Sequence, residues 1–273
     1  MITAHDVTMR IGARELIRGA SFRVDSGMRI GLVGRNGAGK TTLTKLLAGE
    51  ESTSDVVQHS GTITRTGDIG YLPQDPRTGD LDVLARDRVL SARGIDGLLR
   101  RIRRAETEMS TKTGAAQVKA MERYVRLDAE FTAQGGWAAE SEAARFTSSL
   151  GLPTRVLDQP LHTLSGGQRR RVELARILFS GAETLLLDEP TNHLDHDSIV
   201  WLREYLASYS GGLIVISHDV ELLRATINTV FHLDATRGEL DVYNLGWDAY
   251  LTQREQDERR RRRERANAEK KAS

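Results

Sequence analysis

The amino-acid sequence predicts an α/β fold with a helical region inserted in the middle of the chain. Short apolar runs bounded by turn residues occur up to residue 74 and again after residue 161, and such runs are typical of strands. From about residue 81 to 161 the sequence is charged and helix-favouring, with few β-branched residues. A glycine-rich loop stands between an apolar run and a helical stretch, which is the order of elements that builds α/β sheets.

The N-terminal part, up to about Gly61, contains short β-like runs, then an apolar strand expected over Ile30–Val33 and a helix expected over Thr41–Leu47. Residues 62–74 predict two more short strands, because the turn residues Thr66-Gly67-Asp68 separate them. Strand, loop and helix are thus expected in close succession around the glycine-rich loop.

Two helices are expected inside the helical region, over residues 96–110 and 117–134, and their mixed acidic and basic surfaces favour a protruding hairpin. After residue 161, the strands Thr184–Leu187 and Leu213–Ile216 are continuously apolar, which suits a parallel sheet covered on both faces. From Leu251 to the end the chain is helix-forming and carries nine Lys or Arg against five Asp or Glu. Such a basic excess attracts phosphate backbones without sequence preference, although a solvated charge run explains it equally well.

Composition excludes several classes of site. The chain has 273 residues and no cysteine, so disulfides, thiolate metal sites and cysteine nucleophiles are absent. The net charge of +1 argues against a protein that binds polyanions over its whole surface. The N-terminus lacks the apolar core of a signal peptide, and no run approaches the roughly 18 apolar residues of a membrane helix. We therefore expect a soluble, cytoplasmic protein with no membrane insertion.

The glycine-rich loop predicts a phosphate site. Its sequence, Gly34-Arg35-Asn36-Gly37-Ala38-Gly39-Lys40-Thr41, matches the spacing G-x-x-x-x-G-K-[ST] between a predicted strand and a predicted helix. The glycines let successive backbone N–H groups point at phosphate oxygens, and the following helix adds its positive end. Lys40 adds a charge for the β and γ phosphates, and Thr41 offers a hydroxyl to Mg²⁺.

A second helix start is also suited to anions. The segment Leu164-Ser165-Gly166-Gly167-Gln168 precedes a helix with one apolar stripe, made of Val172, Ala175, Leu178 and Phe179. One phosphate loop holds one nucleotide, so the second site suggests a nucleotide held by a partner. The same residues fit an ordinary helix N-cap, and the sequence leaves both interpretations open.

Two carboxylates, Asp188 and Glu189, end a buried strand, where open α/β sheets bind their ligands. We expect Asp188 to hold Mg²⁺ through water or through Thr41. We expect Glu189 to polarise an attacking water as a general base. His218 follows the strand Leu213–Ile216 and is in position to contact the γ phosphate.

With these motifs in this order, the chain resembles the ATP-binding cassette (ABC) superfamily over nearly its whole length. The resemblance implies a P-loop NTPase domain with a mixed sheet core, an N-terminal antiparallel β region and a helical subdomain bearing an arm-like helical hairpin. It implies ATP and Mg²⁺ as ligands and an Mg-dependent ATPase activity. It also implies dimerisation with a second cassette, of the same or another chain, so that each ATP lies between one cassette's Walker A loop and the other's signature.

The resemblance assigns roles to single residues. Lys40, Gln74, Glu189 and His218 become catalytic residues, and Thr41, Gln74 and Asp188 become Mg²⁺ ligands. Nucleotide contacts fall on the Walker A residues Gly34, Arg35, Asn36, Gly37, Ala38, Gly39, Lys40, Thr41 and Thr42, on the signature residues Ser165, Gly166, Gly167 and Gln168, on the D-loop residue Asp195, and on Ile11.

Ile11 marks a departure from the family. ABC cassettes usually carry an aromatic residue ahead of the Walker A loop to stack on adenine, and the segment Met9-Arg10-Ile11-Gly12 has none. Ile11 can pack on the base only by dispersion, so a stacking contribution of about 0.5 to 1.5 kcal/mol is missing. Base recognition is therefore expected to be weak.

Three branches of the superfamily fit to different degrees. A chromosome-maintenance or DNA-repair ATPase is disfavoured, because the distance from Lys40 to Asp188 is short and cysteine is absent, so no DNA partner is expected. The motor subunit of a membrane transporter is the alternative. The details of Gly31–Lys40 and Asp188–Asp195 look instead like the ABC-F branch, whose members act on the ribosome in translation or antibiotic resistance.

The resemblance to ABC-F proteins also divides the chain. Residues 1–250 correspond to the nucleotide-binding domain, with the helical subdomain over about 81–161 and the arm-like insertion over about 96–134. Residues 251–273 correspond to a basic helical linker or tail, which contains Arg259–Arg263 and is a candidate for rRNA contact. ABC-F proteins carry two cassettes, so we expect this chain to be the N-terminal half of one or a single cassette that pairs with another.

Overall fold

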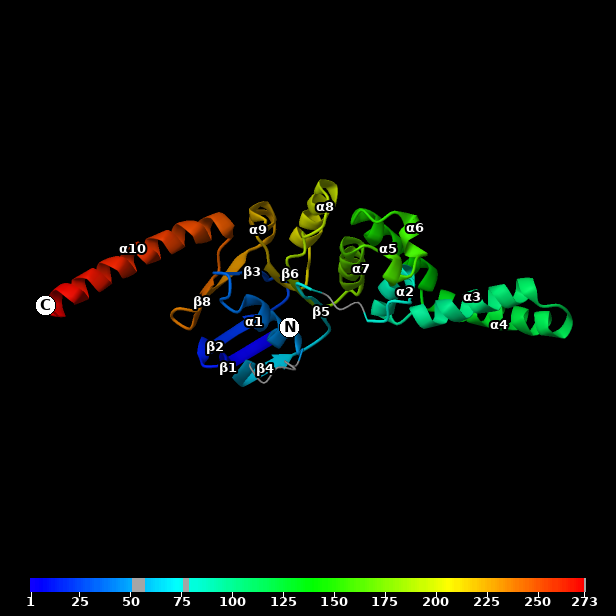
Figure 1. The fold of residues 1–273 in the computed structure, drawn as a ribbon, viewed down its shortest axis with the longest axis horizontal. Helices are drawn as coiled ribbons and strands as arrows, with labels where there is room; N and C mark the ends of the chain where they lie inside the picture. Colours follow the sequence, from blue (N-terminus) through cyan, green and yellow to red (C-terminus); the bar gives the residue numbers. More distant parts are fainter. Residues whose placement is uncertain (51–56, 76–78, 273) are drawn as a thin grey trace. The chain divides into compact units, whose positions relative to one another are not determined.

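The computed structural model describes residues 1–50, 57–75 and 79–272 of the chain, so Ser273 of the expected basic tail lies outside the described residues. The chain divides into two compact units. The first contains Met1–Ile69, Glu183–Pro190 and Arg203–Ser273, and the second contains Gly70–Ala182 and Thr191–Leu202. Each is described by itself below, with the element labels of Figure 1.

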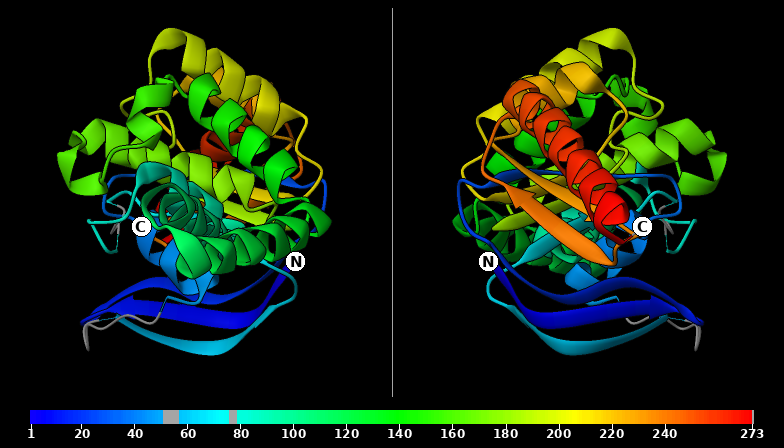
Figure 2. Two further views of the ribbon diagram at one scale, coloured as in Figure 1. Left: turned by 90° about the vertical axis from the view of Figure 1, so that its right-hand side faces the viewer. Right: turned by 90° about the vertical axis from the view of Figure 1, so that its left-hand side faces the viewer.

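The first unit opens with an antiparallel sheet in the order β2-β1-β4, made of β1 (Ile2–Ile11), β2 (Arg14–Val24) and β4 (Val57–Arg65). Figure 2 shows this sheet as a layer of its own, separate from the other strands of the unit. Along β1 the buried side chains Ile2, Ala4, Val7 and Met9 form its inner face. The alternation is interrupted by a register shift between Ala4 and Val7, where Asp6 has a φ of 51°.

The second sheet of this unit follows the order β6-β7-β3-β8-β9. Its strands are β3 (Arg29–Gly34), β6 (Thr184–Asp188), β7 (Gly212–Ile216), β8 (Thr229–Asp234) and β9 (Glu239–Tyr243). Every residue of β6 and β7 is buried, as their continuous apolar sequence predicts. The neighbours β6, β7, β3 and β8 pair in parallel, and β9 pairs antiparallel with β8. The expected mixed sheet and the expected N-terminal antiparallel sheet are thus both confirmed.

Three helices belong wholly to the first unit: α1 (Lys40–Ala48), α9 (Val220–Thr226) and α10 (Trp247–Ala272). The helix α10 contacts α9 and β8 and passes over the β8–β9 hairpin, as the right-hand view of Figure 2 shows. A T-shaped contact between Phe22 and Phe231, with ring centroids 5.2 Å apart, connects β2 with β8. The two sheets of the unit therefore share an aromatic contact in the core.

The second unit is mainly helical. It begins with β5 (Ile69–Leu72) and continues through α2 (Ala85–Leu90), the short 3-10 turns Ser91–Arg93 and Leu161–Thr163, α3 (Asp96–Thr111), α4 (Gly114–Ala133), α5 (Gly136–Ser149), α6 (Thr154–Leu157) and α7 (Gly166–Phe179). The helix α8 (His196–Ala207) begins in this unit and ends in the first. Of the helices that the structure describes, none combines the length and the apolar character needed to cross a bilayer.

Helices α3 and α4 form the hairpin expected from the sequence, although α4 starts at Gly114 rather than at Gln117. Their buried residues lie on facing stripes, and Phe131 makes a T-shaped contact with Trp137 at 4.8 Å. Elsewhere in the unit, the carboxylate of Glu173 on α7 is only 2% exposed and accepts hydrogen bonds from Arg88 and Arg176. A buried carboxylate is stable only with such partners, so α2 and α7 are held together by charge as well as by packing.

We predict that Gly61→Ala destabilises the first unit more than a Gly→Ala substitution at a position with a similar φ and no neighbouring atoms. A methyl group at Gly61, whose φ is +90°, would lie 2.2 Å from the carbonyl oxygen of Asp6 in the neighbouring strand. Both backbone strain and a clash oppose the substitution, so the free energy of unfolding in urea should fall by about 3 kcal/mol.

Gly27→Ala is the matched control for this experiment. Gly27 has a similar φ of +80°, but no atom lies within 4 Å of the added methyl group. Gly27→Ala should therefore lower the free energy of unfolding only through backbone strain, by about 1 to 2 kcal/mol. Equal losses of unfolding free energy in Gly61→Ala and Gly27→Ala would show that the close approach of β1 and β4 does not contribute to the destabilisation.

Candidate functional site

The glycine-rich loop connects the end of β3 with the start of α1, and packing explains its glycines. Gly39, the residue before α1, has a φ of 99°, which favours glycine. A methyl group there would also lie 2.6 Å from Leu16 Cδ1 of β2. At the other end of the loop, a methyl group on Gly34 would lie 2.6 Å from the carbonyl oxygen of Leu233. The loop is therefore enclosed between β2 and β8, and larger residues at these two positions would displace it.

The ammonium group of Lys40 lies over this loop. Its Nζ donates to the carbonyl oxygens of Gly34 at 2.8 Å and of Arg35 at 3.2 Å. Burial lowers the pKa of Lys40, and the nearby carboxylates of Asp188 and Glu189 act in the opposite direction. A cation is thus held between the loop and two carboxylates, where phosphate oxygens can replace the backbone carbonyls as its partners.

Thr41 and Asp188 meet at the adjoining ends of α1 and β6. Thr41 Oγ1 donates a hydrogen bond of 2.7 Å to Asp188 Oδ2, and Asp188 is 2% exposed. A hydroxyl and a carboxylate oxygen side by side are hard donors of the kind that Mg²⁺ takes from proteins, with phosphate and water oxygens completing its octahedron. The described residues contain no cluster of three or more acidic or histidine side chains that would form a metal cage without a substrate. Thr41 Oγ1 and Asp188 Oδ2 are thus two donors that fit Mg²⁺.

Glu189 follows directly and has an unusual backbone. Its φ is 50°, a conformation that non-glycine residues adopt mostly where surrounding contacts enforce it. Its N–H donates to the carbonyl of Ile216 at 2.8 Å, which fixes the residue against the end of β7. The side chain is 9% exposed, and burial raises the pKa of its carboxyl group. Such a carboxylate is a stronger proton acceptor than an ordinary glutamate.

His218 is the partner of this carboxylate. Its backbone N–H donates to Glu189 Oε2 at 3.3 Å, and its Nε2 lies 3.3 Å from Glu189 Oε1. The imidazole itself is 77% exposed, so most of the ring faces solvent. The structure thus brings together Lys40, Thr41, Asp188, Glu189 and His218 in the first unit, as the sequence predicts.

The candidates of the signature motif, Gln74 and Asp195 belong to the second unit. Ser165 is the N-cap of α7: its Oγ accepts from the N–H of Gln168 at 3.1 Å, and its own N–H donates to Gln168 Oε1 at 3.0 Å. The capping interpretation of this motif is therefore confirmed. A methyl group on Gly166 would meet no atom within 4 Å, and one on Gly167 would lie 3.4 Å from His193 Cβ. The first turn of α7 consequently presents backbone without side-chain cover at Gly166.

Gln74 and Asp195 occupy loops of the same unit. Asp195 precedes α8 and accepts a hydrogen bond of 2.9 Å from the N–H of Ser198, which holds the pKa of its carboxyl below the usual value. The backbone carbonyl of Gln74 accepts a hydrogen bond from Arg170 Nη1. Ile11, in the first unit, ends β1 opposite Arg14, and its side chain is aliphatic.

Arg170 and Arg171 are residues that the sequence analysis missed. Arg170 Nη1 donates to the carbonyls of both Pro73 and Gln74, and Arg171 Nε donates to the carbonyl of His193 at 2.8 Å. Two arginines, two and three positions after the signature glutamine, thus fix two loops that carry candidate residues. Their position close to the signature motif could have identified them from the sequence, but arginines in a helix are usually interpreted as solvent-exposed.

Comparison with known proteins identifies the family. A family described as ABC transporter matches residues 17–192. The tylosin resistance ATP-binding protein TlrC of Streptomyces fradiae is 35% identical over 95% of this chain and 47% of its own length. The ATP-binding cassette sub-family F member 3 of Pongo abelii is 34% identical over 90% of this chain and 33% of its own length. The chain thus spans less than half the length of these relatives.

Solved structures agree on the fold. The dimeric post-hydrolysis state of the ATP-binding cassette MJ0796, bound to ADP and Pi, covers 90% of this chain and 100% of its own, with a TM-score of 0.58 and 18% identity. The ATP-binding subunit of an ABC transporter gives a TM-score of 0.62 over 90% of both chains, also at 18% identity. The chain belongs to the ABC transporter family, as a cassette whose relatives along most of its length are ABC-F-type ATP-binding proteins.

Proposed function

We propose that this chain is an ATP-binding and ATP-hydrolysing cassette that works by ATP-driven dimerisation. The observation that carries the proposal is the convergence of Lys40, Thr41, Asp188, Glu189 and His218 at the carboxyl ends of β3, β6 and β7. A bound Mg²⁺ would neutralise charge on the phosphates of the nucleotide. Thr41 and Asp188 would hold it, and Gln74 is the third residue that we assign to it.

The chemistry follows from the two carboxylates. Asp188 accepts a hydrogen bond from the hydroxyl of Thr41 and is assigned to the cation. Glu189 has the raised pKa of a partly buried carboxylate, so it orients the attacking water and accepts its proton. His218 contacts the γ phosphate, and the Walker A residues from Gly34 to Thr42 bind the phosphate chain.

The second cassette supplies the other side of the site. Ser165, Gly166, Gly167 and Gln168 start α7 of the second unit, and we assign them, with Asp195, to the nucleotide held by a partner cassette. The dimeric state of the MJ0796 cassette bound to ADP and Pi supports this assignment by analogy of fold. The partner is a second cassette of the same or another chain.

We further propose that the parent protein is a cytoplasmic ABC-F factor that acts on the ribosome, in translation or antibiotic resistance. The names of the resistance protein TlrC and of the sub-family F member support this branch over a transporter motor. In this proposal residues 1–250 form the nucleotide-binding domain, with α3 and α4 as the arm near residues 96–134, and residues 251–273 form the start of a linker. The transporter motor remains the second candidate, because the solved structures of similar fold include transporter subunits.

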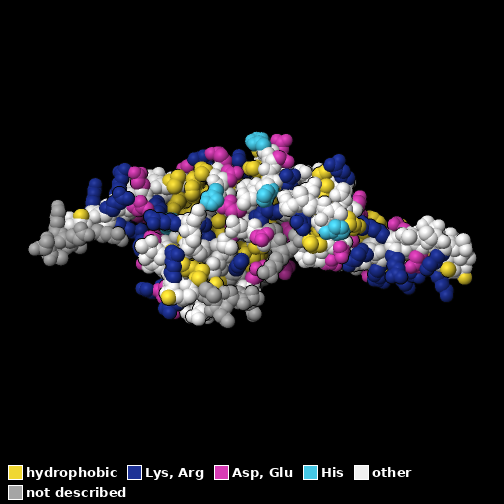
Figure 3. Space-filling model, in the orientation of Figure 1, with side chains coloured by type: hydrophobic (Ala, Val, Ile, Leu, Met, Phe, Trp, Pro, Cys, Tyr) yellow, Lys and Arg dark blue, Asp and Glu magenta, His cyan; other side chains and the backbone are white. Residues whose placement is uncertain are grey.

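The surface of the hairpin supports an RNA partner. Figure 3 shows Lys and Arg side chains gathered along one edge of the α3–α4 hairpin. Arg104, Lys112 and Arg123 are paired with Glu108. Exposed Arg101, Lys119 and Arg126 have no ion pair with the described residues. In α10, by contrast, Arg259, Arg260 and Arg261 are all paired with nearby acidic residues, so much of the expected basic run is already neutralised.

The first prediction is that Lys40→Ala abolishes ATP binding. The substitution removes the cationic side chain that lies over the phosphate loop, so isothermal titration calorimetry with Mg-ATP should give no measurable heat of binding. Lys45→Ala is the matched control, because Lys45 lies on the same helix and is exposed. Unchanged ATP affinity in Lys40→Ala would remove the phosphate loop from the site.

The second prediction concerns Glu189→Gln. The carboxamide keeps the shape of the side chain but cannot accept a proton, so phosphate release should slow by about two to four orders of magnitude while ATP still binds. An ATP-bound dimer should then accumulate in size-exclusion chromatography. Exposed Glu204→Gln should leave turnover unchanged. Phosphate release at the wild-type rate from Glu189→Gln would contradict its role as the base.

The third prediction tests the ribosome. In the Glu189→Gln background with ATP, the protein should co-sediment with ribosomes, and binding should weaken as salt rises. Replacing Arg101, Lys119 and Arg126 by glutamine should make the slope of log affinity against log salt less steep by about two to three, since each lost phosphate contact contributes about 0.7 to 0.9. Arg104→Gln, which breaks only a pair with Glu108, should leave the slope unchanged. Absence of co-sedimentation together with recovery of a membrane protein would favour the transporter alternative.

A further inference from the structure

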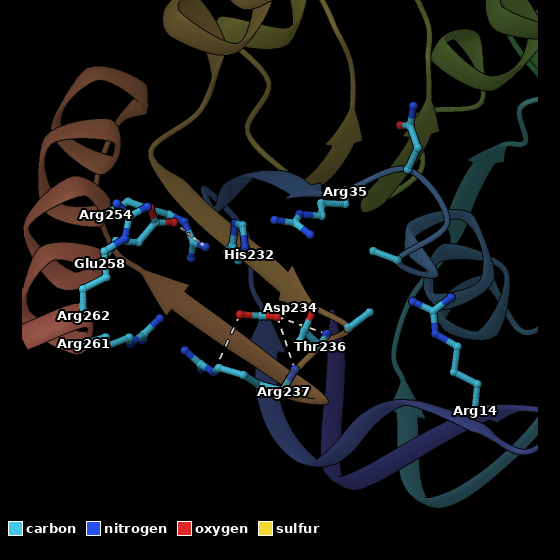
Figure 4. Close-up of a pocket in the computed structure, with 13 residues that line it drawn as sticks. Arg14, Arg35, His232, Asp234, Thr236, Arg237, Arg254, Glu258, Arg261 and Arg262 are labelled. Atoms are coloured by element: carbon cyan, nitrogen blue, oxygen red, sulfur yellow. Dashed lines mark hydrogen bonds and ion pairs between the residues drawn. The ribbon is translucent and has the colours of Figure 1, made fainter. Parts of the chain in front are cut away.

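Figure 4 shows a cavity of about 440 Å³ in the first unit, with Arg35, Asn36 and Ala38 of the phosphate loop among the residues that line it. Because it shares these residues with the candidate nucleotide site, the cavity belongs to that site. Arg171 lies in the second unit and outside this lining. Its contacts indicate a role of its own.

Arg171, on the second turn of α7, connects three segments of the second unit that are far apart in the sequence. Its Nε donates to the carbonyl oxygen of His193 at 2.8 Å, and its Nη1 donates to the carbonyl oxygen of Gly151 at 3.3 Å. The first acceptor belongs to the loop that precedes α8, and the second follows the C-terminal end of α5. A guanidinium group holds its donors in one rigid plane, so the two carbonyls are fixed relative to each other and to α7.

The loop that Arg171 holds contains a backbone conformation that needs support. His193 has a φ of 67°, in the left-handed region that residues other than glycine seldom adopt. Such a residue persists where surrounding contacts enforce it. The hydrogen bond from Arg171 supplies one such contact, and the N–H of Leu194, which donates to the carbonyl of Thr191 at 3.2 Å, supplies another. Arg171 therefore helps to fix the turn that leads into Asp195.

The end of α5 packs closely against Asp195. A methyl group on Gly151, whose φ is +73°, would lie 2.6 Å from Asp195 Oδ2 and 3.1 Å from Ser198 Oγ. It would also lie 3.2 Å from Arg171 Nη1. The hydrogen bond from the N–H of Ser198 lowers the pKa of the Asp195 carboxyl, and the charge of Arg171 acts in the same direction. The carboxylate is thus held where α5, α7 and the start of α8 meet.

The signature belongs to the same assembly of segments. Ser165, the N-cap of α7, lies less than two helical turns before Arg171. A methyl group on Gly167 would lie 3.4 Å from His193 Cβ, so the first turn of α7 and the loop lie against each other. Ser165 and Asp195 are both exposed, although the groups that hold them are packed. The second unit therefore presents these two residues to solvent with a fixed spacing.

We propose that Arg171 is a positioning residue for ATP hydrolysis, which holds the loop of Asp195 beside the signature so that both act together on the nucleotide of the partner cassette. This inference rests on the proposed function, which assigns Ser165 and Asp195 to that nucleotide. It adds the residue that sets their relative position. Because Arg171 acts through these residues, its loss should leave ATP binding to the phosphate loop of the same chain intact and should lower turnover.

The first measurement separates binding from turnover. In Arg171→Gln, the affinity for Mg-ATP measured by calorimetry should stay within about twofold, while kcat should fall about ten- to a hundredfold, as expected for one lost charged hydrogen-bonding partner. Arg171→Lys keeps the charge but not the rigid pair of donors, so kcat should fall nearly as far. Arg145→Gln, which removes an exposed charge from α5, should leave kcat unchanged. A wild-type kcat in either Arg171 variant would overturn the proposal.

The two glycines that flank α5 provide a matched pair of variants. Gly151→Ala crowds Asp195, whereas Gly135→Ala, at a φ of +70°, places its methyl group where no atom lies within 4 Å. Both substitutions strain the backbone, but only the first should displace the loop and lower kcat, by about tenfold. Urea unfolding checks that both variants are folded under the assay conditions. Equal values of kcat in the two variants would contradict the proposal.

The last measurement asks on which nucleotide Arg171 acts. Arg171→Gln and Glu189→Gln chains are mixed before ATP is added, so that mixed dimers form. In a mixed dimer, one site combines the intact Glu189 of one chain with the intact Asp195 loop of the other. The mixture should regain up to about a quarter of wild-type turnover, because half of the dimers formed at random are mixed and each keeps one intact site.

Two outcomes of the mixing experiment would count against the proposal. No gain in turnover over the separate variants would show that Arg171 acts on the nucleotide of its own chain, and would overturn the inference while leaving the ATPase function in place. A wild-type chain that hydrolyses no ATP at all would contradict the proposed function, and the inference with it.

Discussion

The hydrogen bond from Thr41 Oγ1 to Asp188 Oδ2 is the contact on which the arrangement of the site depends. It joins residues 147 positions apart, one at the start of α1 and the other at the end of β6. The loop that precedes Thr41 is thereby fixed relative to the carboxylate that precedes Glu189. Because Asp188 is buried, its charge needs a donor, and the Thr41 hydroxyl supplies one. The same two oxygen atoms are those that we propose as ligands of a nucleotide-bound cation.

The backbone after Asp188 shows how this constraint extends to the neighbouring residue. With Asp188 fixed at the strand end, Glu189 adopts a φ of 50° and donates its N–H to Ile216. The turn directs two adjacent carboxylates to different partners, Asp188 to Thr41 and Glu189 to His218. In an extended strand, successive side chains would point to opposite faces of the sheet. The strained residue therefore allows neighbours in sequence to serve different roles at one edge of the sheet.

Much of this arrangement could be predicted from the sequence, because its signals are local. The spacing from Gly34 to Thr41, the apolar run before Asp188 and the helical texture of α3 and α4 each depend on residues close together in the chain. The pairing of β1 with β4 in the three-stranded sheet could not be predicted in the same way. It depends on the close approach of the two strands at Gly61 and on the bulge at Asp6. The role of Arg170 also depends on partners that are distant in the chain, the carbonyls of Pro73 and Gln74. The run Arg259–Arg263 looks uniformly basic in sequence, yet Asp241 of β9 and acidic residues of α10 neutralise three of its members.

The capping box at Ser165 uses only part of the hydrogen-bonding capacity of the serine hydroxyl. A hydroxyl has one proton and two lone pairs, and the cap of α7 uses a lone pair, since Ser165 Oγ accepts from Gln168. The proton stays available to a phosphate oxygen of the partner-held nucleotide that we assign to this residue. The Oγ atom of Ser165 can then stabilise the helix and bind an anion at the same time, because the two interactions use different parts of the hydroxyl. Among the other amino acids, threonine alone combines a short hydroxyl with a strong N-cap preference, so it is the replacement that preserves both capacities.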